Sequence, residues 1–167
     1  DPQIIKDYFK LNKVNCEINE IKDNEYFKDF KKNTINVIPI KVLEKVVIGS
    51  PSIKNASFVK DSIVKCVNIQ LTSIASAIVT NPINKKIMYD SGFNYTGHTE
   101  FLASLSIKKK HPVMMIVGKN LKTIPLTIHV PLKKVSQLIT RKLIISTVKI
   151  ARKCLISYFG FSRPRII

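Results

Sequence analysis

The chain has 167 residues, 45% of them hydrophobic, and a formal net charge of +17. This length suits one domain or part of a larger one, and the hydrophobic share excludes an intrinsically disordered chain. No apolar run approaches the roughly 20 residues that a membrane-spanning helix needs, and the opening Asp1-Pro2-Gln3 does not have the pattern of a signal peptide.

The three cysteines, Cys16, Cys66 and Cys154, lie far apart and are odd in number. This arrangement predicts neither a disulfide framework nor a thiolate metal site, and it is typical of a reducing compartment. We therefore expect a cytoplasmic protein.

Lysine supplies nearly all of the positive charge: 24 Lys accompany 4 Arg, together with 26 Ile and 12 Asn. A/T-rich codons encode Lys, Ile and Asn, so drift in base composition explains this bias without a polyanionic partner. Proteins that read bases also favour Arg, whose planar guanidinium forms bidentate hydrogen bonds. We therefore do not expect nucleic acid as a partner, but a basic nucleic-acid-binding module and attraction to a small phosphorylated ligand stay open as alternatives.

The first part of the chain predicts few elements. Residues 1–11 suit a short helix, and residues 14–21 alternate as in a strand. The polar, charged composition of residues 24–33 predicts a loop, and residues 35–40 suit a second strand. Residues 1–48 are therefore the poorly defined part of the expected unit.

The next part of the chain is clearer. Apolar residues at helical spacing predict a helix over residues 50–71, and the β-branched run of residues 75–80 predicts a buried strand. Asn81 and Pro82 are typical of an N-cap and a first helical position, and Gly92 is typical of the residue that follows a helix end.

Four more elements follow. Thr99 is a candidate N-cap, before a short apolar stretch. Residues 112–118 and 124–130 predict two further buried strands, and Pro131 opens a helix after the second.

The final segment predicts a long helix that Thr140 caps and Gly160 ends, and residues 163–167 suit the start of a further strand, the fourth from residues 75–80 onward. Strands and helices thus alternate along the chain. This alternation predicts a single α/β unit over residues 1–167, with a mostly parallel sheet that helices cover on both faces.

Ligands of such sheets gather where parallel strands end. Thr80-Asn81-Pro82-Ile83-Asn84-Lys85 follows a predicted strand, and its helix N-terminus and lysine suit a phosphate or carboxylate. An ordinary capped helix is the alternative interpretation. The sequence contains no G-x-G-x-x-G dinucleotide motif and no Walker A loop.

Three histidines are the other candidates. His129 ends a predicted strand, where an imidazole could bind a metal or a substrate, but no second histidine or cysteine lies at metal-ligand spacing from it. His98 lies between Gly97 and a candidate helix start, so it is either a ligand-binding group or an ordinary loop residue. His111 follows a lysine run and is expected to be exposed.

The stretches "AIVTNPINKKIMYDSGFNYTGHTEFLA", "MMIVGKNLKTIPLTIHVPLKKV" and "YFGFSRPRI" carry a family resemblance. Together they resemble the 4-hydroxythreonine-4-phosphate dehydrogenase family of vitamin B6 biosynthesis. The motifs T-N-P-I-N-K, G-H-T-E-F and T-x-H-x-P-L follow one another in that family's order and at similar spacing. The resemblance is strong over residues 49–167 and thinner over residues 1–48.

The resemblance implies a three-layer α/β/α fold similar to that of isocitrate and isopropylmalate dehydrogenases, in a homodimer with active sites between subunits. It implies that NAD or NADP oxidises 4-phosphooxy-L-threonine to 2-amino-3-oxo-4-phosphooxybutyrate, which loses CO2 to give 3-amino-2-oxopropyl phosphate. It also implies a divalent metal (Zn, Mg or Co), held by three histidines, that polarises the hydroxyl being oxidised.

Carried over residue by residue, the resemblance places substrate contacts on His98 and Thr99 and one metal ligand on His129. Lys85 falls in a family motif and is a possible phosphate contact. Ile128 departs from the threonine that the family often has beside the metal ligand. No catalytic or cofactor-binding residue follows from the motifs that are present.

The family's glycine-rich opening and the two segments with its other metal histidines do not occur in these 167 residues. We therefore expect a fragment of the dehydrogenase that is incomplete in fold and inactive by itself, because a zinc site needs at least three protein ligands. A degraded remnant without activity is the remaining alternative.

Overall fold

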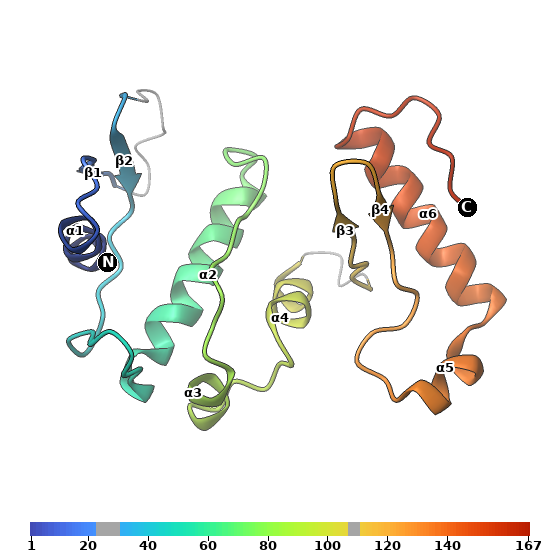
Figure 1. The fold of residues 1–167 in the computed structure, drawn as a ribbon, viewed down its shortest axis with the longest axis horizontal. Helices are drawn as coiled ribbons and strands as arrows, with labels where there is room; N and C mark the ends of the chain where they lie inside the picture. The colour runs from blue at the N-terminus through green and yellow to red at the C-terminus, as the bar shows by residue number, and fades with distance from the viewer. Residues whose placement is uncertain (23–30, 107–110) are drawn as a thin grey trace. The chain divides into compact units, whose positions relative to one another are not determined.

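The computed structural model describes residues 1–22, 31–106 and 111–167 (Figure 1). The chain divides into two compact units, which we call unit 1 (Asp1–Leu105) and unit 2 (Ser106–Ile167). Among the described residues, no helix combines the length and the apolar character that crossing a membrane would require.

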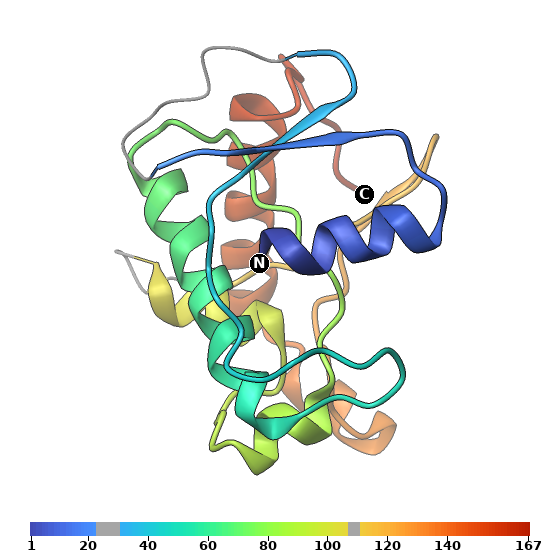
Figure 2. The same ribbon diagram turned by 90° about the vertical axis from the view of Figure 1, so that its left-hand side faces the viewer.

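Unit 1 begins with helix α1 (Pro2–Leu11), whose first turn is capped by the Asp1 carboxylate accepting from the backbone N–H of Gln3. Strands β1 (Glu17–Glu20) and β2 (Thr34–Val37) then pair in parallel (Figure 2). The predicted helix and both predicted strands are confirmed, the strands within shorter bounds. Most of the predicted loop over residues 24–33 lies outside the described residues.

The other elements of unit 1, among its described residues, are helices. A 3-10 turn, η1 (Ile53–Asn55), leads into α2 (Ala56–Leu71), and α3 (Lys85–Asp90) and α4 (His98–Leu105) follow. Their apolar faces form one core of buried side chains, made of Ala56, Ile63, Met88, Phe93 and Phe101. The core therefore joins α2, which precedes the T-N-P-I-N-K motif, to α3 and to α4, which contains most of the G-H-T-E-F motif.

Unit 2 contains a hairpin of two short strands, β3 (Ile116–Val117) and β4 (Lys122–Thr123), followed by α5 (Leu132–Leu138) and α6 (Arg141–Ser157). Its buried side chains among the described residues all lie on α6, at Thr147, Ala151 and Leu155. These three residues follow one another at intervals of four, so they form a single stripe along the helix.

Several predicted strands are absent from the described residues. Residues 75–80, 124–130 and 163–167 adopt neither helix nor strand, and the predicted strand over 112–118 is reduced to β3, which pairs antiparallel rather than parallel. Strands form only where a neighbour accepts their backbone hydrogen bonds. The side chains agree with this: Val79, expected in a buried strand, is 95% exposed.

Two predicted helix starts are wrong by one turn or less. Helix α3 is capped by Asn84 and not by Asn81, because the Asn84 side chain accepts from Ile87 N–H at 3.1 Å. Helix α4 begins at His98, because the Phe101 N–H already donates to the Gly97 carbonyl at 3.2 Å. Thr99 is therefore a helical residue and not a cap.

The other helix boundaries follow the sequence closely. The Thr140 side chain accepts from Leu143 N–H and caps α6, as predicted. Gly92 and Gly160 have φ values of +86° and +72°, a left-handed conformation that glycine adopts without a steric cost. Pro131 directly precedes α5.

Candidate functional site

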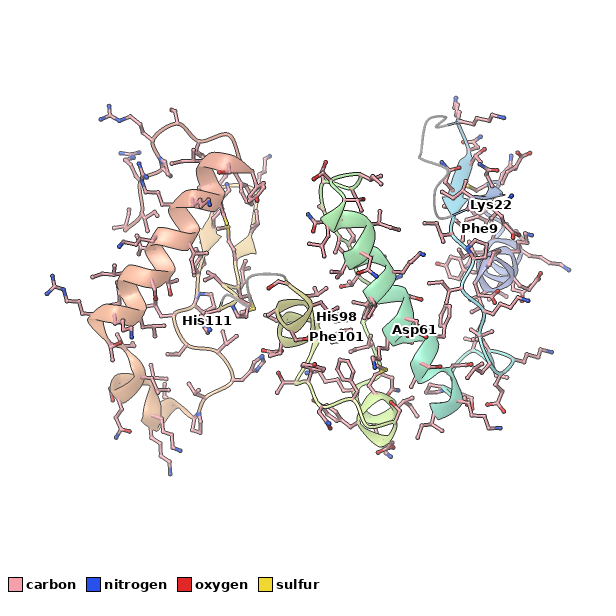
Figure 3. All side chains as sticks on the ribbon, turned by 180° about the vertical axis from the view of Figure 1, so that it is seen from behind. Phe9, Lys22, Asp61, His98, Phe101 and His111 are labelled. Atoms are coloured by element: carbon pink, nitrogen blue, oxygen red, sulfur yellow. The ribbon has the colours of Figure 1, made fainter. Side chains whose placement is uncertain are left out.

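His98 is the first residue of α4, and its side chain is only partly exposed. Its Nε2 atom is buried and has no hydrogen-bond partner among the described residues. A buried polar atom without a hydrogen-bond partner lowers the stability of the fold by about 1–3 kcal/mol. Such atoms are therefore rare unless a ligand or a water molecule forms the hydrogen bond. Figure 3 shows His98 beside Phe101 on α4. His98 is thus a helical residue and not a loop residue, and its Nε2 atom has no acceptor or donor among the described residues.

Three aromatic rings hold the segment that precedes His98. The ring centroids of Phe93, Tyr95 and Phe101 lie 5.2, 5.0 and 5.1 Å apart in the three pairwise combinations. Tilted and edge-to-face contacts at this distance stabilise by about 0.5–1.5 kcal/mol per pair beyond the burial of their area. The turn that carries His98 is therefore set by packing on its own unit.

One hydrogen bond adds to this packing. The Tyr89 hydroxyl, on α3, donates to the carbonyl of Thr96 at 3.3 Å. Thr96 lies two residues before His98, so this contact links α3 to the start of α4. Sequence analysis did not identify the supporting role of Tyr89, Phe93 or Tyr95. The signal that could have found it is the number of aromatic residues within residues 89–101.

Thr99 is partly buried in the first turn of α4, next to His98. The first turn of a helix presents backbone N–H groups and the positive end of the helix dipole, which suits an anionic ligand. Glu100 lies in the same turn, and its Oε2 atom is 3.9 Å from the position that a Cβ on Gly97 would take. An anion at this helix start would thus have a carboxylate close by.

Lys85 is exposed at the first position of α3. Among the described residues, no hydrogen bond or ion pair joins Lys85 to His98 or Thr99. Its neighbour Lys86 instead pairs with Asp90 at 2.8 Å. The hydrogen bond from this pair, followed by its charge attraction, raises the pKa of Lys86 above its usual value. Among the described residues, the Lys85 ammonium group forms no ion pair.

His129 belongs to unit 2, whereas His98 and Thr99 belong to unit 1. Its side chain is exposed and its backbone is left-handed, with a φ of +57°, which is uncommon for a residue other than glycine. The predicted strand end at His129 is therefore a bend outside any strand. In residues 1–22, 31–106 and 111–167, no three His, Cys, Asp or Glu side chains gather as they would around a metal ion. These residues alone do not fit a metal, and His129 could supply one ligand at most.

The comparisons with known proteins decide the family. The family model of the pyridoxal phosphate biosynthetic protein PdxA matches residues 1–167, which is the whole chain. The chain belongs to the PdxA family. A 4-hydroxythreonine-4-phosphate dehydrogenase of Methylorubrum extorquens is 33% identical over the whole chain, and one of Bradyrhizobium diazoefficiens is 43% identical over 71% of it. The resemblance seen in the motifs is thus confirmed.

Solved PdxA structures give the same result for the fold. The 4-hydroxythreonine-4-phosphate dehydrogenase of Klebsiella pneumoniae matches 98% of the chain with a TM-score of 0.85 and 26% identity. The corresponding enzyme of Burkholderia phymatum matches 99% with a TM-score of 0.86 and 24% identity. The α/β class is confirmed, with a parallel strand pair and only part of the fold present. The chain spans about half the length of these relatives, 49% in each of the two structures and in the first of the two sequences.

Proposed function

We propose that this chain supplies the substrate-binding part of an NAD- or NADP-dependent 4-hydroxythreonine-4-phosphate dehydrogenase. The observation that carries the proposal is the buried, unpartnered Nε2 atom of His98 at the start of α4. It lies in the G-H-T-E-F motif of a chain that belongs to the PdxA family. The relatives that match it are named for that dehydrogenase activity.

The reaction would consume 4-phosphooxy-L-threonine. A hydride would leave the carbon that bears the hydroxyl and reduce the nicotinamide, while the hydroxyl proton would pass to a base. The product, 2-amino-3-oxo-4-phosphooxybutyrate, is a β-keto acid, and it would release CO2 and take up a proton to give 3-amino-2-oxopropyl phosphate. In this proposal, His98 and Thr99 bind and orient the substrate.

The substrate carries a phosphate and a carboxylate, so cationic and N–H donors suit it. His98 and Thr99 share the first turn of α4, and the first backbone N–H groups of a helix have no acceptor within the helix itself. Lys85 is proposed as a further phosphate contact, since its ammonium group is exposed at the start of α3. These groups explain binding and orientation, and no catalytic residue is assigned among them.

His129 is proposed as one ligand of a divalent metal, whose other ligands would come from residues outside this chain's described part. A homodimer with shared active sites is proposed for the complete enzyme. Because the chain spans about half the length of its relatives, we expect that turnover needs further protein residues and that the 167-residue chain is inactive by itself.

Substrate binding is the direct test. We expect 4-phosphooxy-L-threonine to bind the chain in isothermal titration calorimetry, and His98→Asn to weaken binding about tenfold or more, the equivalent of one lost charge-assisted hydrogen bond. His111→Asn is the matched control, because His111 is exposed and lies outside the site. Equal binding by the His98→Asn variant and the unchanged chain would refute the assignment of His98.

An activity assay separates binding from turnover. NADH or NADPH formation from 4-phosphooxy-L-threonine is measured with added Zn²⁺, Mg²⁺ or Co²⁺. We expect no turnover by the chain alone under conditions in which it binds the substrate. Turnover would show that the expected inactivity is wrong and that the chain carries a complete active site.

A further inference from the structure

Unit 2 differs from unit 1 in its charge. All 11 carboxylate residues of the chain precede Ser106, so unit 2 contains no Asp or Glu. Unit 2 nevertheless carries half of the 28 basic residues, including all four arginines. Base-composition drift acts on the whole gene and explains the excess of lysine, but it does not explain why the acidic residues are confined to one unit. The expectation that nucleic acid is no partner rested on the excess of lysine over arginine in the whole chain.

The positive charge of unit 2 has no carboxylate side chain to balance it within the unit. The ion pairs Lys6–Glu20, Lys54–Glu44 and Lys86–Asp90 of the described residues all lie in unit 1. Unit 1 as a whole has more basic than acidic residues, so it offers no surplus of negative charge either. Like charges gathered in this way repel one another and attract polyanions.

Helix α6 arranges part of this charge on one surface. Arg141, Lys142 and Lys149, with Ile145 and Ser146 between them, line an open hollow of about 540 Å³ along the first turns of the helix. Arg141 and Lys149 are eight residues apart, which corresponds to about 12 Å along a helix axis. All three cations are exposed. This surface, called the α6 basic face below, offers a row of cations at spacings suited to successive phosphates.

Exposed aromatic residues follow α6 directly. Tyr158, Phe159 and Phe161 are 80%, 45% and 41% exposed, and Arg163 and Arg165 come next in the chain. The ammonium group of Lys122 lies 5.2 Å from the centre of the Phe161 ring. Proteins that bind single-stranded nucleic acid combine a cationic track with aromatic rings on which bases stack. An acidic protein partner would explain the cations but not the exposed rings beside them.

We propose that unit 2 binds single-stranded nucleic acid, with the α6 basic face contacting phosphates and Tyr158 stacking on a base. This function is separate from the dehydrogenase activity, because it uses neither His98, Thr99, Lys85 nor His129. Binding would be largely independent of sequence, because phosphate contacts and ring stacking accept every base.

Fluorescence anisotropy of the 167-residue chain with a labelled oligothymidylate of about 15 nucleotides tests the proposal, since one such site covers about 4–16 nucleotides. We expect binding that weakens with salt. The double variant Lys142→Gln, Lys149→Gln should reduce the slope of log K against log salt by about 1.4, because each phosphate that a protein neutralises on a single strand contributes about 0.7.

The matched control removes two exposed lysines from helices of unit 1, with the variant Lys10→Gln, Lys60→Gln. It changes the net charge by the same amount and should change affinity less than twofold. Equal losses of affinity in the two double variants would overturn the proposal, because the effect would then be one of net charge alone. Circular dichroism of both variants should show unchanged helix content.

A second variant distinguishes a surface that binds nucleic acid from one that binds an acidic protein. Tyr158→Ser should weaken oligothymidylate binding about fivefold or more, the loss expected for one stacked base. It should leave binding of polyglutamate unchanged, because polyglutamate offers charge without bases. If Tyr158→Ser has no effect, and polyglutamate binds as tightly as the oligonucleotide, unit 2 is a general polyanion or acidic-protein surface and the proposal is wrong.

Discussion

Unit 1 and unit 2 differ in the side chains that they bury. Unit 1 buries side chains from several elements in one core, with the Phe93, Tyr95 and Phe101 rings in mutual contact. Among the described residues, unit 2 buries only a stripe of α6, and many of its large apolar side chains are exposed, such as Leu132 at 87%. The candidate substrate residues thus lie on the unit with the better core, where packing can hold a binding group in place.

The largest expected effect tests the core of unit 1. Phe101 is 2% exposed, and Phe101→Ala should lower the free energy of unfolding of unit 1 by about 3–5 kcal/mol. Hydrogen exchange measured in low concentrations of urea should show reduced protection in α2 and α4 and retained protection in α6. Phe159→Ala is the control, since Phe159 is 45% exposed. Equal loss of protection in α6 would mean that the two units unfold together.

A smaller effect tests unit 2, which depends on its longest helix. The Thr140 hydroxyl caps α6 by accepting from Leu143 N–H at 3.2 Å. Thr140→Ala should therefore destabilise α6 by about 1 kcal/mol, as the loss of an N-cap does. Thr140→Ser keeps the hydroxyl, so it should retain most of the stability that Thr140→Ala loses. Exchange of the first amides of α6 measures both variants, and unchanged rates in Thr140→Ala would show that the cap is not formed.

The smallest effect concerns pH and belongs to unit 1. The hydrogen bond from the Ser52 hydroxyl, and then the hydrogen bond and charge of Lys54, lower the pKa of Glu44 below 4.5. Because the folded-state pKa is depressed, this contribution to stability is present above about pH 4.5 and is lost as the pH falls through the lowered pKa. An NMR titration of the Glu44 carboxyl measures the shift.

The Ser52→Ala variant sharpens this test, because it removes the largest cause of the shift. Its Glu44 pKa should move back toward 4.5, and Lys54→Gln, which removes the other hydrogen bond and the neighbouring charge, should move it in the same direction. A Glu44 pKa that is the same in the unchanged chain and in Ser52→Ala would contradict the hydrogen bond between the two side chains.

Local sequence signals predicted the parts of the fold that depend on nearby residues. The Thr140 cap, the left-handed Gly92 and Gly160, and helices α1, α2 and α6 were each expected from patterns within a few residues. The motifs around His98 also predicted the family, which the match over the whole chain confirmed. The start of α3 could not be fixed by local signals, because Asn81 and Asn84 are both suitable N-caps. Only the hydrogen bond from Ile87 N–H to the Asn84 side chain distinguishes them.

The tertiary structure alone decided which apolar segments become strands and which polar atoms lack a partner. Residues 75–80 have the composition of a buried strand, but a strand also needs a neighbour for its backbone, and Val79 is 95% exposed. The unpartnered Nε2 of His98 likewise depends on how α4 packs, which no local pattern contains. The sequence by itself determined the family, the helices and the uneven charge. Long-range hydrogen bonds and packing, which link residues far apart in the chain, determined the strands and the environment of the candidate site.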